Sequence, residues 1–406
     1  MREVSACPIR TIGWEETEAG VAKGQGGRDC HPGHRVSEVC FGSGHSFAAQ
    51  AIPQTRTLAR TRLLPPLARI AAGLALGTLG GLVFYLLNLP LPWMLGALFA
   101  TMVASVAGAP VLGPTRLRPA IVAIIGVLLG SRFTPGVVEQ AGEALVTLAI
   151  LVVYLGAVTL VVVPFYRFVG RQDWTTAYFA GMPGGLSEMI EMGEARGANV
   201  PAIVLAHSLR IVVTIALMAF LFRVVLDHDV GGSVAAAGPP IGVLDAILLA
   251  ASALLGAILG IKLRLPAPTF LGPLILSAAA HLSGLTESAP PSLLVIAAQV
   301  VLGTILGCRF LGIAPVMLWK AGLLSLGSTV LTLALAVVAG LAMRAGAGVD
   351  LEQALLALAP GGLTEMGLMA LAIQADVAFV ALHHVVRILI VIVLAPVFSR
   401  LLPGRT

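Results

Sequence analysis

Two nearly identical heptapeptides place a proline, two glycines and a carboxylate inside otherwise apolar sequence. They read PGGLSEM at residues 183–189 and PGGLTEM at residues 360–366. Proline lacks a backbone N–H and glycine adopts dihedral angles that other residues resist, so each motif predicts an interrupted helix with free backbone N–H and C=O groups. A helix N-terminus attracts anionic groups, and a carboxylate within an apolar segment is a candidate functional group. We therefore expect a solute- or ion-binding site formed by Pro183, Gly184, Gly185, Ser187, Glu188, Pro360, Gly361, Gly362, Thr364 and Glu365.

A histidine follows each motif, and an arginine follows each histidine by three residues. These pairs, His207 with Arg210 and His384 with Arg387, complete the predicted site. Residues three apart share one face of a helix. Because arginine stays charged, we expect each to pair with a glutamate of a motif, and we expect the histidines to relay protons. The same cluster could instead be a buried polar network that clamps the protein together, and the sequence leaves this alternative open.

Short polar side chains stand where four helices are expected to begin. Ser187 and Thr364 lie just after the two breaks, and Asn199 and Asp376 precede the apolar segments that carry the histidines. Oxygen atoms of such side chains accept hydrogen bonds from the free N–H groups of a helix's first turn. We expect all four to be N-caps.

The composition is that of a membrane protein. The chain of 406 residues is 58% hydrophobic and 11% charged, whereas soluble domains carry about 25% charged residues. Apolar runs long enough to cross a bilayer recur from about residue 67 onward. The net charge of +5 forms no basic stripe with aromatic residues, so we expect no nucleic acid among the partners.

The two motifs belong to a longer internal repeat. LPLPWMLGALF (89–99) matches LPAPTFLGPLI (265–275), and GVLLGSRF (126–133) matches GTILGCRF (303–310). We therefore divide the membrane part into repeat 1 (67–226) and repeat 2 (242–402), joined by a Gly- and Pro-rich linker (227–241). Each repeat offers six apolar segments, of which the fifth contains the break.

The distribution of Lys and Arg favours halves of opposite orientation. If both broken segments enter and leave on the same side, each half crosses the membrane five times. Only Arg132, Arg223 and Arg344 then lie outside, in keeping with the excess of positive charge on the cytoplasmic side of membrane proteins. The predicted fold is all-α, with two inverted repeats of about five transmembrane helices, each with a broken or re-entrant helix, and with both termini cytoplasmic.

Two matched arginines and four matched glycines predict structural roles. Arg132 and Arg309 each end a matched segment, and we expect them to extend toward the membrane surface from helix ends. The preceding glycines are spaced for close helix packing: Gly126, Gly130, Gly303 and Gly307.

Residues 1–66 form a polar segment that we expect to be a disordered tail. It holds Cys7, Cys30 and Cys40, and its two histidines between residues 30 and 40 match no common zinc spacing. We predict no metal and no cofactor, and we assign no function to this segment.

The duplicated PGGL[ST]EM motif with its following His and Arg resembles the AbrB family of bacterial membrane proteins, over about residues 67–402. The family is known for an internal duplication and is described as transporters related to inverted-repeat antiporters. Some members carry the label ammonia monooxygenase, and the family name points to regulation of gene expression. The resemblance implies a multi-pass protein of the bacterial inner membrane, without identifying a substrate.

We expect a secondary transporter of a small solute, coupled to protons or cations, with its site at the interface of the two broken helices. Interrupted helices in inverted repeats are the usual construction of such transporters. Its partners would be the lipid bilayer, a small molecule or ion, and a second copy in a homodimer. Two alternatives stay open: a membrane-embedded metal-dependent monooxygenase and a membrane regulator of gene expression.

Overall fold

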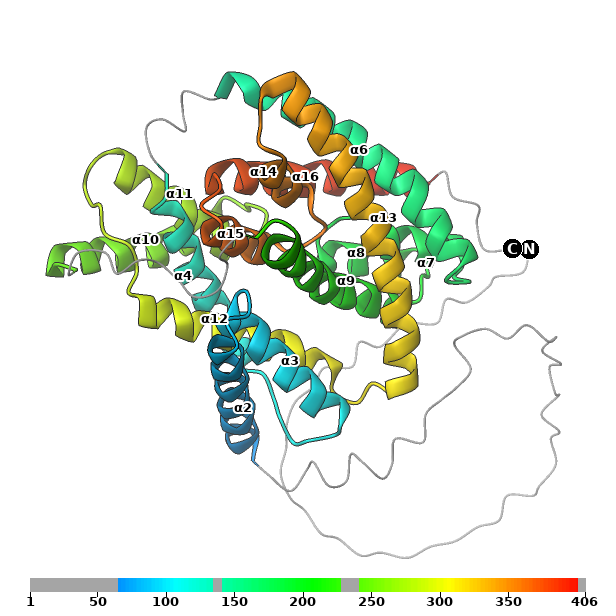
Figure 1. Cartoon of the computed structure of the whole chain (residues 1–406), viewed down its shortest axis with the longest axis horizontal. Helices are drawn as coiled ribbons and strands as arrows, with labels where there is room; N and C mark the ends of the chain where they lie inside the picture. Colours follow the sequence, from blue (N-terminus) through cyan, green and yellow to red (C-terminus); the bar gives the residue numbers. More distant parts are fainter. Residues whose placement is uncertain (1–64, 134–140, 228–240, 401–406) are drawn as a thin grey trace, which may run out of the picture. The chain divides into compact units, whose positions relative to one another are not determined.

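The computed structural model describes residues 65–133, 141–227 and 241–400, and its regular structure there is helical (Figure 1). Almost all of the predicted tail (1–66) and of the predicted linker lies outside these residues, and α2 begins at Pro66, the last residue assigned to the tail. The helices of the first half are α2 (Pro66–Leu86), α3 (Pro92–Val106), α4 (Arg118–Gly130), α6 (Ala141–Phe168), α7 (Trp174–Gly181), α8 (Leu186–Ala195) and α9 (Val200–Phe220). Those of the second half are α10 (Val243–Lys262), α11 (Pro268–Leu282), α12 (Ser292–Gly307), α13 (Pro315–Ala347), α14 (Leu351–Leu358), α15 (Leu363–Ala372) and α16 (Val377–Ser399). Three single turns complete the list: η1 (Thr115–Leu117), η2 (Leu221–Val225) and η3 (Cys308–Phe310).

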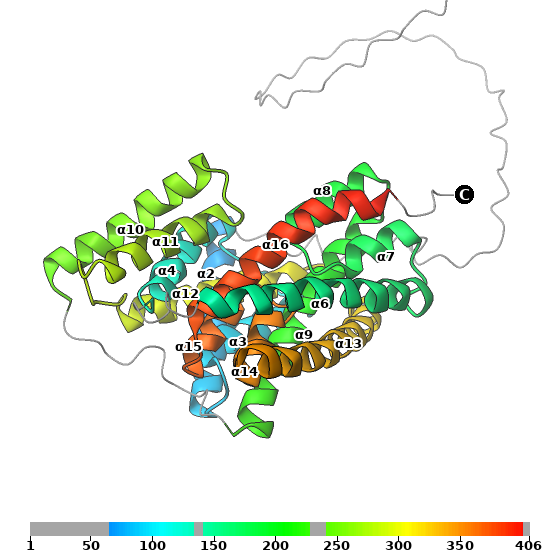
Figure 2. The same cartoon turned by 90° about the horizontal axis from the view of Figure 1, so that it is seen from above.

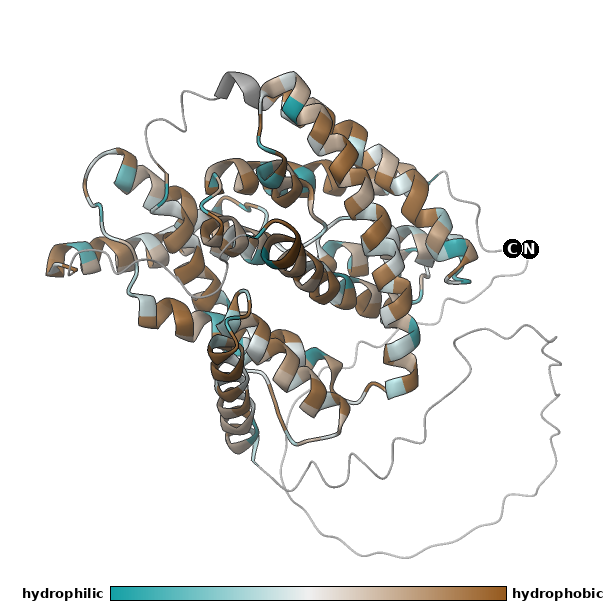
Figure 3. Cartoon of the chain, in the orientation of Figure 1, coloured by the Kyte–Doolittle hydropathy of each residue, from teal (hydrophilic) through white to brown (hydrophobic). Residues whose placement is uncertain are grey.

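Long helices carry apolar side chains on their outer surfaces. Within the described residues, seven helical segments are long and apolar enough to cross a membrane. Leu160 on α6 is 77% exposed and Val338 on α13 is 66% exposed, and Figure 3 shows apolar residues along most of these helices. Lipid tails, unlike water, make exposed apolar surface favourable. The chain is therefore a multi-pass helical membrane protein.

Three of the ten helices expected to cross the membrane are shorter than the thickness of the bilayer core. α3 and α11 have 15 residues each and α4 has 13; 15 residues reach about 22 Å, against a bilayer core of about 30 Å. α3 and α11 each begin at a proline. Leu91 and Ala267, the residues before these prolines, have left-handed backbone with φ of 43° and 47°.

The two halves interlock through close contacts at glycines. α3 packs on α12 and α4 packs on α11. A Cβ on Gly303 would overlap the backbone of Met94, and one on Gly126 would overlap the backbone of Phe270. The predicted packing role of these glycines is confirmed.

The longest helices of the two halves, α6 and α13, lie side by side (Figure 2). The hydroxyl groups of Tyr166 and Ser328 are 3.1 Å apart. Near the start of α6, Val146 lies beside Gly346, close to the end of α13. Residues later in α6 therefore contact residues earlier in α13, so the two helices are antiparallel.

Both predicted helix breaks are confirmed. α7 ends at Gly181 and α8 begins at Leu186, while α14 ends at Leu358 and α15 begins at Leu363. The first broken pair folds back on itself, because the N–H of Asn199, after α8, donates to the hydroxyl of Thr176 in the first turn of α7, at 2.8 Å. In the second half, α14 also contacts α15.

The predicted caps divide into two that are confirmed and two that are wrong. Asn199 accepts from the N–H of Ala202 at the start of α9, and Asp376 accepts from two N–H groups at the start of α16. Ser187 and Thr364 are instead the second residues of α8 and α15, which have glycine at the N-cap position. The reason lies in the glutamates that follow, whose carboxylates take the place that a capping side chain would occupy.

Candidate functional site

Each motif glutamate lies at the N-terminus of a half-helix. Glu188 and Glu365 are the third residues of α8 and α15, and their carboxylates fold back against the N-cap glycines. A Cβ on Gly185 or Gly362 would overlap a carboxylate oxygen, so each glycine leaves room for the glutamate side chain to fold back. A carboxylate at this third position is favoured by the free N–H groups and the positive end of the helix dipole.

The two glutamates differ in their surroundings. Glu365 is 5% exposed and accepts a hydrogen bond from the Thr364 hydroxyl at 2.8 Å, whereas Glu188 is half-buried. The difference follows from packing, because α15 contacts α4 and α9 while α8 packs mainly on α7 and α9 of its own half.

The arginines lie at the opposite ends of the breaks. Arg210 donates to the carbonyl of Met182, which directly follows α7, at 2.9 Å. Arg387 donates to the carbonyls of Ala359 and Gly361, which follow α14, at 2.6 and 3.0 Å. Carbonyl groups at a helix C-terminus lack partners within the helix and carry partial negative charge, so a cation is favourable there.

The predicted pairing of these arginines with the motif glutamates is therefore wrong. Within residues 65–133, 141–227 and 241–400, Arg210 and Arg387 bond to carbonyl oxygens of their own half instead. The physical reason is that one break creates two ends of opposite polarity. Glutamate stabilises the N-terminal end and arginine stabilises the C-terminal end.

His207 holds Arg210 in place. Its Nδ1 is 2.9 Å from a guanidinium nitrogen of Arg210, and its Nε2 is 2.8 Å from the carbonyl oxygen of Phe179. Because a guanidinium only donates, Nδ1 must accept and Nε2–H must donate. Both ring nitrogens are thereby used, so this geometry favours a positioning role over the predicted proton relay.

The repeat is not symmetric at this point. His384, the match of His207, is buried and bonds through Nδ1 to Val380 one turn earlier. Tyr154 of α6 supplies the extra donor in the second half, because its hydroxyl donates to the carbonyl of Leu358 at 2.9 Å. Sequence reasoning missed Tyr154, which lies in a different half from the carbonyl that it binds.

A cavity of about 430 Å³ joins the two breaks. It is lined by every predicted site residue except His384: Pro183, Gly184, Gly185, Ser187, Glu188, His207, Arg210, Pro360, Gly361, Gly362, Thr364, Glu365 and Arg387. The remaining wall comes from the start of α4, the start of α11 and the end of α12. Segments of both halves thus meet around one space that holds charged side chains.

Two arginines in this wall were not predicted to belong to the site. Arg118 is the first residue of α4 and is exposed, and Arg309 follows α12. Arg309 lines the cavity, a contact that its position at a helix end did not predict. Its repeat match, Arg132, is exposed and does not line it. The sequence gives both residues the same context, so it carries no signal that separates them.

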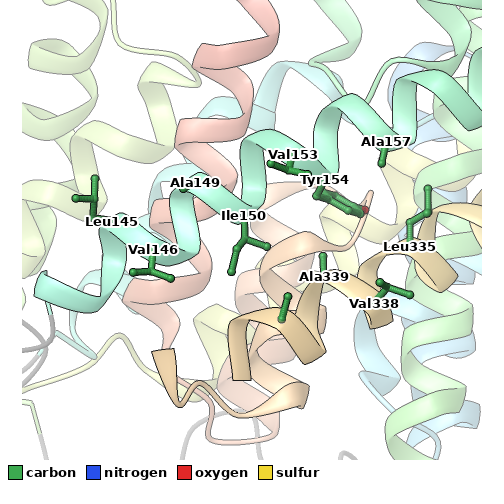
Figure 4. Close-up of a pocket in the computed structure, with 11 residues that line it drawn as sticks. Leu145, Val146, Ala149, Ile150, Val153, Tyr154, Ala157, Leu335, Val338 and Ala339 are labelled. Atoms are coloured by element: carbon green, nitrogen blue, oxygen red, sulfur yellow. The ribbon is translucent and has the colours of Figure 1, made fainter. Parts of the chain in front are cut away.

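A second cavity, of about 590 Å³, lies between α6 and α13 (Figure 4). Its lining is aliphatic apart from Tyr154, whose hydroxyl donates a hydrogen bond to the carbonyl of Leu358. Such a lining provides no group for acid–base chemistry or for binding charge. We therefore place the candidate site at the charged cavity. No group of three or more His, Cys, Asp or Glu side chains within the described residues could hold a metal ion.

Comparisons with known proteins agree with the motifs. Residues 93–403 match the model of the AbrB family, described as transition state regulatory protein AbrB. The chain is 26% identical over 366 residues to "Uncharacterized protein YhjN" of Bacillus subtilis strain 168, covering 81% of this chain and 92% of the relative. It is also 26% identical over 328 residues to "Putative regulator AbrB" of Escherichia coli strain K12, covering 78% and 91%. With most of its length matched by the family model, the chain belongs to the AbrB family.

Proposed function

We propose that the protein is a secondary transporter of a small solute in the bacterial inner membrane. The observation that carries this proposal is the cavity formed jointly by two interrupted helices, with ionisable side chains at both breaks. Polar backbone at membrane depth is tolerated only where protein or a water-filled cavity satisfies it, and transporters bind solutes at such breaks. Alternating access then requires the two halves to move about the shared site.

The contacts between matched helices support inverted halves. α6 matches α13 in the repeat, and the two run antiparallel. Similarly, Arg118 at the start of α4 and Arg309 after the end of α12 line the same cavity, although α4 matches α12. A two-fold axis in the membrane plane reverses the direction of matched helices, whereas an axis along the membrane normal preserves it.

The lengths of the half-helices support breaks near the membrane midplane. α7 has 8 residues and α8 has 10, which correspond to about 12 and 15 Å, roughly half of the bilayer core. Because this pair folds back on itself, we propose that it enters and leaves on the same side. If α14 and α15, of 8 and 10 residues, do the same, the ten other helices cross, with both termini in the cytoplasm, as the charge distribution predicts.

We propose that Glu188 and Glu365 couple transport to protons or cations. A carboxylate at an opened helix can release a proton to a cavity or share a cation with nearby carbonyl groups. Replacing either glutamate with glutamine retains its size and part of its hydrogen bonding but removes the charge.

The test is solute and ion flux in proteoliposomes that contain the wild-type chain, Glu188→Gln or Glu365→Gln. We expect both variants to lose coupled flux. Glu191→Gln is the matched control, because Glu191 is exposed on the same helix as Glu188 and does not line the cavity. Wild-type flux in both cavity variants would refute the proposed role of the glutamates.

The name of the Escherichia coli relative favours a second candidate, a membrane regulator. In that case the protein would act through a stable cytoplasmic partner, which a pull-down with the purified chain would recover. A stoichiometric transition metal in the purified protein would instead favour the monooxygenase alternative.

A further inference from the structure

The cavity between the breaks holds more positive than negative side chains. Four arginines and two glutamates line it, which leaves a formal excess of two positive charges. The half-helix ends do not cancel this excess. Two N-termini contribute about half a positive charge each and two C-termini about half a negative charge each, so together they add nothing.

Two of the four cavity arginines make no hydrogen bond to the described residues. Arg118 and Arg309 line the same cavity, where Arg309 lies within electrostatic range of both Arg118 and Glu365. Within the part of the chain that the structure describes, neither guanidinium donates a hydrogen bond to another residue. Two like charges facing one cavity repel each other, so an anion between them would be attracted by both.

The cavity wall also contains buried N–H groups that donate no hydrogen bond within the described chain. The Nε groups of Arg210 and Arg387 are buried without a partner in the described chain, although these side chains are only 7% and 4% exposed. Leaving a buried donor unsatisfied is costly unless a ligand or water completes it. The Nε groups of Arg69 and Arg167, which do not line the cavity, also lack a partner in the described chain. What is particular to Arg210 and Arg387 is that they line the cavity, where a ligand that accepts hydrogen bonds would suit them.

We propose that the transported solute is a small anion with a carboxylate or phosphate group, bound between Arg118 and Arg309. This inference rests on the proposed transport function and adds its substrate class. The planar guanidinium fork matches the oxygens of such groups with two parallel hydrogen bonds. The volume of about 430 Å³ is within the range of small-molecule sites. A free cation would meet net repulsion there unless it entered with the anion or at a glutamate.

Binding to the detergent-purified full-length chain tests the proposal without requiring flux. The probes are sodium acetate, succinate, phosphate and sulfate, compared with choline chloride and sucrose at matched ionic strength. We expect at least one of the four anions to raise the unfolding temperature and to give a saturable calorimetric titration. Absence of binding by all four anions, or tighter binding of choline, would overturn the proposal.

The variants use the internal repeat as a control. Arg309→Gln should weaken anion binding by about tenfold or more, because it removes a charged donor from the site. Arg132→Gln, at the matched position outside the cavity, should bind like the wild type. Arg118→Gln provides a second test at an exposed position whose replacement leaves the core intact. Unchanged binding in both Arg309→Gln and Arg118→Gln would contradict the proposed site.

Binding and flux together separate this inference from the proposed function. If anions bind through Arg309 but no solute crosses proteoliposomes, the anion site stands and transport fails. If a cation or neutral solute crosses equally well with the wild type and Arg309→Gln, transport stands and the anion proposal fails.

Discussion

Arg387→Gln tests how the second helix break is stabilised. In the wild type, its guanidinium donates to the carbonyl oxygens of Ala359 and Gly361, and the side chain is 4% exposed. Glutamine is too short to reach both carbonyl groups, so each loses a charged donor in a buried place. At about 1–3 kcal/mol for each unsatisfied group, the expected loss of unfolding free energy is about 2–6 kcal/mol.

The measurement is chemical unfolding of the purified protein in mixed micelles, followed by far-UV circular dichroism. Arg132→Gln is the control, because Arg132 is exposed and outside the cavity; its unfolding free energy should change by less than about 0.5 kcal/mol. Arg387→Lys should give an intermediate loss, since an ammonium keeps the charge but not the fork. If Arg387→Gln is as stable as the control, the C-terminal end of α14 does not depend on this arginine, and our account of the break is wrong.

Two further substitutions test the packing that supports the site. Gly303→Ala places a methyl group against the backbone of α3 and should destabilise the protein by about 1–3 kcal/mol, whereas Gly156→Ala, where nothing lies within 4 Å, should be neutral or slightly stabilising. The same unfolding measurement compares them, and equal stabilities would contradict the interlocked halves. Tyr154→Phe removes the hydroxyl that donates to the carbonyl of Leu358 and should lower the unfolding free energy by about 1–3 kcal/mol. Tyr85→Phe is the control, because the Tyr85 side chain is 46% exposed. An unchanged unfolding midpoint in Tyr154→Phe would show that this hydroxyl does not stabilise the end of α14.

The positions of the breaks and the starts of α9 and α16 could be predicted because they depend on local chemistry. A proline followed by two glycines interrupts a helix wherever it stands, so residues 183–185 were enough to place the gap between α7 and α8. Asn199 and Asp376 could likewise be identified as caps, since a cap binds N–H groups two or three residues away. Ser187 was misplaced because the competing carboxylate of Glu188 lies only one residue further along.

The amino-acid sequence by itself therefore determined the apolar helices, the duplication and the residues that surround the breaks, all of which follow from composition and short-range spacing. Only the tertiary structure decided what each charge contacts. Arg132 and Arg309 have the same local sequence, yet only Arg309 reaches the cavity, because the end of α12 meets the starts of α4 and α11 there. Tyr154 binds a carbonyl more than two hundred residues away for the same reason. Contacts between elements of different halves depend on how the whole chain packs, and no local pattern records them.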